Sequence, residues 1–226
     1  RAAGWLYPAG AALSGAGAAL VITGGELVTT ASAGAATAPS VGAIAGAMAG
    51  DAAAVLALSS RIVGRTALLY GYDPEQPAEK LFIMAVVNAG SAVSAGAKTA
   101  AFADLSKLTQ ALIRGKSWAV LNESLIARLA GAFSKRFVGR LTKQALGKFV
   151  PTVGIVIGGA LNWATLEGIA DAADAAYRHR FLLEKYPELG EGDAFGVLDD
   201  PDDDLDGSDV RISVLDELAE EGITDL

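Results

Sequence analysis

The segment of residues 149–181, FVPTVGIVIGGALNWATLEGIADAADAAYRHRF, constrains the fold more than any other part of this chain. Its first half has no charged residue, and its second half adds acidic residues at steps of three and four. An apolar run that continues into charged positions at helical spacing is typical of one long helix. As a membrane span the run is short and glycine-rich. We therefore predict a single helix that begins at Pro151 and ends near Tyr186.

The rest of the chain follows the same helical periodicity. The one stretch that alternates like a strand is VRISV at residues 210–214. Gly71 supplies a helix stop signal, and Ser213 is a suitable helix cap. Further helices are expected at residues 40–70, 78–98, 99–114, 117–132, 134–149 and 213–221. The prediction is an all-α fold, with a single multi-helix bundle over residues 1–190 and an acidic tail with a short terminal helix over residues 191–226.

Small residues dominate the beginning of the chain. The sequence has 27 glycines, and much of its 52% hydrophobic content is alanine. Gly42, Gly46 and Gly50 place a smooth stripe on one helix face, which lets a neighbouring backbone approach closely. The stripe fits tight packing within a soluble bundle, and it also fits a membrane-inserting glycine zipper. Because glycine and alanine contribute little to membrane insertion, the first interpretation is favoured.

Charge is strongly segregated along the chain, although the net charge is −8. Residues 98–148 hold ten basic and two acidic side chains, a net charge of +8, whereas residues 184–226 hold sixteen acidic and two basic ones, a net charge of −14. A basic middle favours an anionic partner, and the acidic tail is expected to contact the basic helices. The sparse aromatic residues and a pI of about 4.7 argue against nucleic acid, so anionic lipid fits better.

One polar constellation lies in the long late helix. Glu167, Asp171, Asp174 and Arg178 are spaced by four, three and four residues, so they share one helix face. Three carboxylates there could bind a divalent cation or perform acid–base catalysis, while the alternative is a solvated face with Arg178 paired to Asp174. His179, the sole histidine, is a candidate neutral base or simply a boundary residue beside two arginines.

Further polar residues stand in apolar helices and are candidate ligand contacts. Asp51 follows the glycine stripe, so its carboxylate must be paired, for which a basic residue is expected, or be protonated. Arg61 and Arg65, one turn apart, suit a carboxylate or a lipid phosphate. Asn162 beside Trp163 is either a polar link between helices, which we favour, or a ligand contact. No cofactor and no particular metal is indicated.

These features together resemble the EcsC family of bacterial proteins. The resemblance is carried by the junction YGYDPEQPAEKLFIMAVV, by the basic helical middle, and by the late motif on Pro151, Gly154, Gly158 and Asn162, over residues 10–186. It implies a membrane-associated helical protein. It brings no catalytic residue with it, because the family has no established activity to transfer.

Three functional hypotheses follow. The leading one is a peripherally membrane-associated protein that binds a lipid or another hydrophobic molecule between its helices. The second is an enzyme for a hydrophobic substrate that uses the carboxylate face and His179, and the third is a membrane-inserting or pore-forming protein. The partners that fit are an anionic membrane surface, a hydrophobic ligand, the chain's own tail and a second copy of the chain. Without cysteines there is no disulfide framework, which favours the cytoplasm, at the inner face of the cell membrane or free of it.

Overall fold

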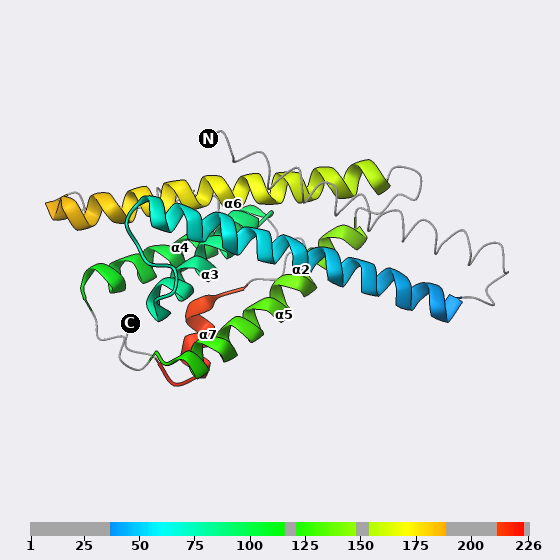
Figure 1. Cartoon of the computed structure of the whole chain (residues 1–226), viewed down its shortest axis with the longest axis horizontal. Helices are drawn as coiled ribbons and strands as arrows, with labels where there is room; N and C mark the ends of the chain where they lie inside the picture. The colour runs from blue at the N-terminus through cyan, green and yellow to red at the C-terminus, as the bar shows by residue number, and fades with distance from the viewer. Residues whose placement is uncertain (1–36, 116–120, 148–153, 189–211, 224–226) are drawn as a thin grey trace. The chain divides into compact units, whose positions relative to one another are not determined.

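The computed structural model describes residues 37–115, 121–147, 154–188 and 212–223, and these residues form helices and their connections without a strand. The all-α prediction is therefore confirmed (Figure 1). The helices are α2 (Thr37–Leu69), α3 (Pro77–Ser91), α4 (Ala95–Ile113), α5 (Glu123–Gly147), α6 (Gly154–Lys185) and α7 (Val214–Glu220). The glycine-laced run and the carboxylate ladder lie on one helix, α6, as predicted. Pro151 lies outside the described residues, as does the boundary at residue 190.

The chain divides into two compact units. The first contains residues 1–58 and 138–167, and the second contains residues 59–137 and 168–226. Helices α2, α5 and α6 each contribute residues to both units. In the second unit α3 packs against α4, and both contact α7.

The middle of α3 forms the centre of the second unit. Its sequence LFIMAVVNA is apolar all round, as a fully buried helix requires. Leu81, Phe82 and Val86 have no exposed surface, and Leu105 of α4 is equally buried. Burial of such side chains contributes about 1.5–3 kcal/mol each to the free energy of unfolding. Helix α3 therefore supplies much of the hydrophobic core of the second unit.

Two helix boundaries differ from the sequence prediction. The predicted helix at 78–98 is interrupted after Ser91, because Ser94 adopts an extended conformation and accepts a hydrogen bond from Ala97 N at 3.2 Å, which begins α4. The predicted break near residue 133 does not occur. Phe133 is buried beside Phe137, and Ser134 donates to the Ala130 carbonyl within the helix, so α5 continues through both.

In the second unit, α3 and α6 approach each other closely at two glycines. A Cβ atom at Gly90 of α3 would lie 2.4 Å from Ile169 Cα, and one at Gly168 of α6 would lie 2.7 Å from the Gly90 carbonyl oxygen. Only glycine allows two helices to cross at this separation. Gly50, the last residue of the predicted stripe, has nothing within 4 Å of its Cβ position, and the surroundings of Gly42 and Gly46 lie outside the described residues.

Two predicted end signals are confirmed. Gly71 adopts a φ of +88° directly after α2, a conformation that side chains with a Cβ rarely take. Ser213 accepts a hydrogen bond from Asp216 N at 3.1 Å and caps α7. The candidate strand at VRISV is not formed over its described part, because Val214 already belongs to α7.

Candidate functional site

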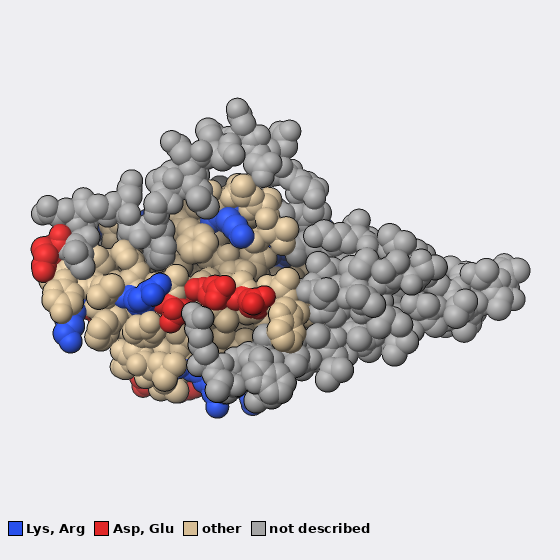
Figure 2. All heavy atoms as spheres, turned by 90° about the horizontal axis from the view of Figure 1, so that it is seen from above, with Lys and Arg blue, Asp and Glu red and all other residues tan. Residues whose placement is uncertain are grey.

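The predicted carboxylate face lies on the surface of α6. Glu167, Asp171, Asp174 and Arg178 are all exposed. Figure 2 shows acidic side chains in a row on the face seen from above, with a basic one at the end of the row. The Tyr70 hydroxyl donates to Asp174 Oδ1 at 3.1 Å, and burial together with this carboxylate raises the pKa of Tyr70. Among the described residues no three His, Cys, Asp or Glu side chains are placed to hold a metal ion.

His179 is not on the carboxylate face. Each residue turns an α-helix by about 100°, so the imidazole lies to one side of the row that ends at Arg178. The side chain is half-buried, and this burial lowers the pKa of His179 below the usual value for histidine. Both alternatives for His179, a neutral base and a boundary residue, are compatible with this position, and desolvation favours the neutral form of the imidazole.

Asp51 and Asn162 meet in the first unit. The Asn162 amide nitrogen donates to both carboxylate oxygens of Asp51, each at 2.9 Å, and both side chains are half-buried. The favoured interpretation of Asn162 as a link between helices agrees with this geometry. One partner of Asp51 is thus an amide, and pairing with a basic residue stays a prediction. Trp163 beside it is exposed.

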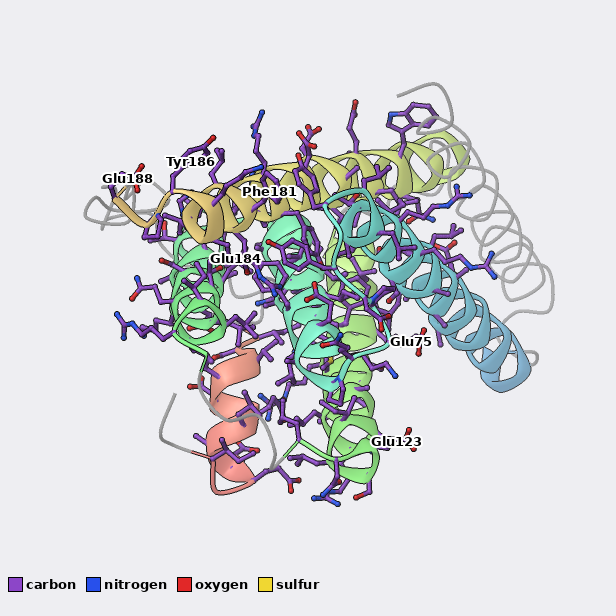
Figure 3. The ribbon with its side chains drawn as sticks, turned by 60° about the vertical axis from the view of Figure 1, so that its left-hand side comes forward. Glu75, Glu123, Phe181, Glu184, Tyr186 and Glu188 are labelled. Atoms are coloured by element: carbon purple, nitrogen blue, oxygen red, sulfur yellow. The ribbon has the colours of Figure 1, made fainter. Side chains whose placement is uncertain are left out.

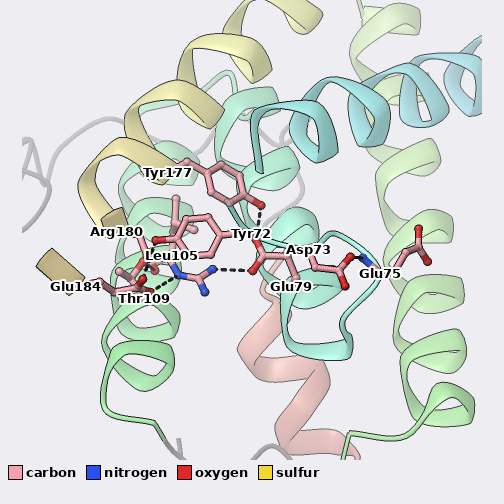
Figure 4. Close-up of polar contacts among 9 residues, drawn as sticks. All are labelled: Tyr72, Asp73, Glu75, Glu79, Leu105, Thr109, Tyr177, Arg180 and Glu184. Carbon is pink, nitrogen blue, oxygen red and sulfur yellow. Dashed lines mark hydrogen bonds and ion pairs between the residues drawn. The ribbon is translucent and has the colours of Figure 1, made fainter. Parts of the chain in front are cut away.

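Sequence reasoning missed a buried charged cluster in the second unit (Figure 4). Arg180 Nη1 donates to Glu79 Oε2 at 2.8 Å, and Tyr177 Oη donates to Glu79 Oε1 at 2.5 Å. Glu79 is 4% exposed, Arg180 is 8% exposed and Tyr177 is fully buried. Both oxygens of one buried carboxylate are satisfied, so α3 is tied to α6 through charge as well as through the glycine crossing.

The rim of the cluster extends to the surface. Arg180 Nε donates to Glu184 Oε1 at 3.1 Å, and Tyr72 Oη donates to Glu184 Oε2 at 2.9 Å. The Arg180 guanidinium also lies 4.0 Å from the centre of the Tyr72 ring, a cation–π contact. Burial alone would lower the pKa of Arg180, but the Glu79 and Glu184 carboxylates outweigh it and raise that pKa. Burial and Glu79 likewise raise the pKa of Tyr177.

This arrangement favours a structural role for the cluster. The charges compensate one another, and the innermost carboxylate, Glu79, is only 4% exposed. The centre of the Phe82 ring lies 5.0 Å from the Arg180 guanidinium. The two segments that supply it were both conspicuous in the sequence, as the YGYD junction and as YRHRF. What the sequence did not show is that residues about 100 positions apart meet.

The profile of the EcsC protein family matches residues 24–182, which is more than half of the chain. The chain belongs to the EcsC family. A similar curated protein, the "Uncharacterized protein YdbA" of Bacillus subtilis (strain 168), is 30% identical over 146 residues, which cover 61% of this chain and 48% of YdbA. The chain thus spans about half the length of that relative. No solved structure matches the chain significantly. The YGYD junction and Asn162 of this EcsC chain both lie within the matched region.

Proposed function

We propose that this protein associates peripherally with membranes that contain anionic lipid, through the exposed face of α2. One observation carries the proposal. By length and composition, the part of α2 from Ala49 to Leu69 is long and apolar enough to cross a membrane. Only 33% of its most apolar 18-residue stretch is buried. Single exposed apolar side chains are common on protein surfaces, whereas a long apolar helix that is mostly exposed favours a hydrophobic contact outside the chain.

The exposed side of this helix combines leucines with arginines. Leu68 is 60% exposed and Leu69 is 85% exposed, and Arg61 and Arg65 precede them on the surface at helical spacing. Between residues 52 and 69 the helix has these two cations and no acidic residue. A helix that offers apolar side chains for the acyl boundary and guanidinium groups for phosphates suits the interface of an anionic bilayer.

The opposite side of α2 favours peripheral contact over insertion. Ile62 is 8% exposed, while Val63 and Ala67 are completely buried in the second unit. A spanning helix would have to withdraw these side chains from their packing, at about 1.5–3 kcal/mol for each large one. The proposal therefore places α2 on the membrane surface while its inner side remains packed. The ligand is bilayer lipid.

Flotation with liposomes tests the proposal. The protein of 226 residues is mixed with vesicles of phosphatidylcholine alone or of phosphatidylcholine with phosphatidylserine, an anionic lipid. Binding to the anionic vesicles and weaker binding to the neutral ones are expected. Arg61→Gln combined with Arg65→Gln should reduce the anionic preference, whereas Leu68→Ser combined with Leu69→Ser should weaken binding to both vesicle types.

A matched control uses two other exposed cations. Lys98→Gln combined with Lys107→Gln on α4 removes the same charge from a different helix. This pair should bind like the wild type. If it loses binding while the arginine pair keeps it, the basic middle of the chain and not α2 faces the lipid. If the wild type shows no preference for anionic vesicles, the electrostatic part of the proposal is wrong.

A further inference from the structure

The C-terminal helix α7 is anchored in the second unit by apolar side chains. Ile212, Val214 and Leu218 are 2%, 3% and 0% exposed. The buried Asn88 amide of α3 donates to the Ile212 carbonyl at 2.6 Å. These contacts fix the position of a seven-residue helix that would not be stable in isolation.

The acidic side of α7 faces α5, beside which it lies (Figures 1 and 3). Arg128 reaches Glu221 with its Nε and Nη2 atoms, the shortest distance being 2.8 Å. Arg136 Nε lies 2.9 Å from Glu217, and its Nη2 lies 3.6 Å from Glu220. Both arginines are therefore paired with carboxylates of α7 and of Glu221 directly after it.

Without these carboxylates, this part of α5 would be strongly basic. Between residues 124 and 137 the helix has Arg128, Lys135 and Arg136 and no acidic residue. Guanidinium groups pair with phosphate oxygens in the same forked geometry that they use for carboxylates. The α7 glutamates stand in the positions that the oxygens of a lipid phosphate would take.

We infer that Arg128 and Arg136 form a second binding site for anionic lipid headgroups, for which Glu220 of α7 and Glu221 directly after it compete. The inference rests on the proposed membrane association and adds a regulation to it. The chain limits its own affinity for a charged surface by pairing the arginines internally.

The accessibility of the pairs makes the competition feasible. The side chains of Arg128 and Glu221 are 57% and 33% exposed, and that of Glu220 is 67% exposed. Exposed ion pairs are weak and are screened by salt, so they exchange partners readily. Glu217 is different, because its side chain is 6% exposed and belongs to the buried anchor. Exchange therefore involves the two outer glutamates while α7 remains packed.

The test neutralises the outer glutamates and leaves the anchor intact. Glu220→Gln combined with Glu221→Gln in the full chain releases Arg128, while Arg136 keeps its contact with Glu217. The affinity for phosphatidylserine vesicles should rise about fivefold, the usual effect of one basic residue near an anionic surface. Adding Arg128→Gln and Arg136→Gln should cancel the gain. Glu167→Gln combined with Asp171→Asn, which removes two exposed charges from α6, should leave the affinity unchanged.

The outcomes separate the inference from the proposed function. If the wild type floats with anionic vesicles but the Glu220 and Glu221 double variant binds no better, competition by α7 is refuted while membrane association stands. An equal gain in the α6 control would also refute it, since net charge alone would explain the effect. If neither the wild type nor the double variant binds, both proposals fail. Circular dichroism melting checks that every variant is folded.

Discussion

The Glu79–Arg180 pair illustrates how a buried charge is tolerated at a single site. Removing two ions from water is unfavourable, and their mutual attraction compensates only if the remaining hydrogen-bonding capacity is satisfied. Here Tyr177 takes the second carboxylate oxygen of Glu79, and Glu184 takes another N–H group of Arg180. Each member of the cluster is needed mainly because its absence would leave another one unpaired.

Substitution of one partner should therefore be severe. We expect Arg180→Ala to lower the free energy of unfolding by about 3–5 kcal/mol, because Glu79 would be left as an unpaired buried carboxylate. Tyr177→Phe should cost about 1–3 kcal/mol through the lost hydrogen bond to that carboxylate. Urea unfolding followed by circular dichroism measures both.

The neighbouring exposed pair serves as the control. Lys80 Nζ lies 3.2 Å from Glu75, whose side chain is 82% exposed and projects away from the ribbon in Figure 3. Lys80→Ala should change stability by no more than about 1 kcal/mol. Equal effects at Lys80 and Arg180 would show that the cluster does not hold α6 against α3.

His179 gives a pH dependence with a definite sign. Its pKa is lowered by burial, so the unfolded chain binds a proton at this residue that the folded chain does not, between the folded pKa and about 6.5. Stability from this group is therefore lost as pH falls through that window. Since His179 is the sole histidine, its imidazole resonances can be followed by NMR without assignment, and a midpoint below 6.5 is expected.

A companion measurement isolates the contribution of this residue. The urea midpoint of the wild type should fall more between pH 7.5 and pH 5.5 than that of His179→Gln. A titration midpoint at or above 6.5 would mean that desolvation does not govern this imidazole.

At the scale of elements, the crossing of α3 and α6 depends on two glycines. Gly90→Ala would put a methyl group against the backbone of Ile169, and neither backbone can move without separating the helices. We expect a loss of at least about 1–3 kcal/mol, the range for overpacked cores. Thermal melting provides the comparison.

Gly139 in α5 is the matched control, because nothing lies within 4 Å of its Cβ position. Gly139→Ala should be neutral or stabilise the protein by up to about 1 kcal/mol, since alanine is the better helix former. A harmless Gly90→Ala would mean that the two helices do not approach as closely as described.

The helices that contain these glycines could be predicted from the sequence, but the point at which they cross could not. Periodicity correctly predicted that the elements are helices and that α6 is continuous, because both follow from local patterns. The close contact was expected where glycine recurs every fourth residue, yet it is observed at Gly90, the sole glycine of α3, and at Gly168, which lies outside the glycine repeat at the start of α6. The point at which two helices cross depends on both helices, so the spacing of glycines along one helix cannot predict it.

The same reason limits prediction of the candidate site. The carboxylate face on α6 could be derived from spacing, and the structure shows those side chains exposed. The buried cluster could not, because Glu79 and Arg180 are 101 residues apart and both read as ordinary surface charges in the sequence. Asp51 and Asn162 were each recognised as needing a partner, but not as partners of each other.

At the scale of the whole molecule, the proposed membrane association depends on the segregation of basic and acidic residues along the chain. Only part of the basic excess is available, because Arg128 and Arg136 are paired with α7 and Arg140 is buried. Raising the ionic strength from 0.1 M to 1 M shortens the Debye length from about 10 Å to about 3 Å. Flotation with anionic vesicles should therefore decrease strongly with salt, and a residual fraction should persist through Leu68 and Leu69. Complete insensitivity to salt would contradict a role for Arg61 and Arg65.

The contacts of α6 with earlier parts of the chain are long-range, which matters while the protein is being synthesised. The partners of Tyr177, Arg180 and Asp174 lie 98, 101 and 104 residues earlier in the chain. At about 5–20 residues per second, α2 and α3 leave the ribosome roughly 5–20 s before α6 can cover them. During that interval the apolar sides of both helices face the cytosol or whatever surface lies nearby. The nascent chain therefore keeps this apolar surface exposed until its own last long helix has been synthesised.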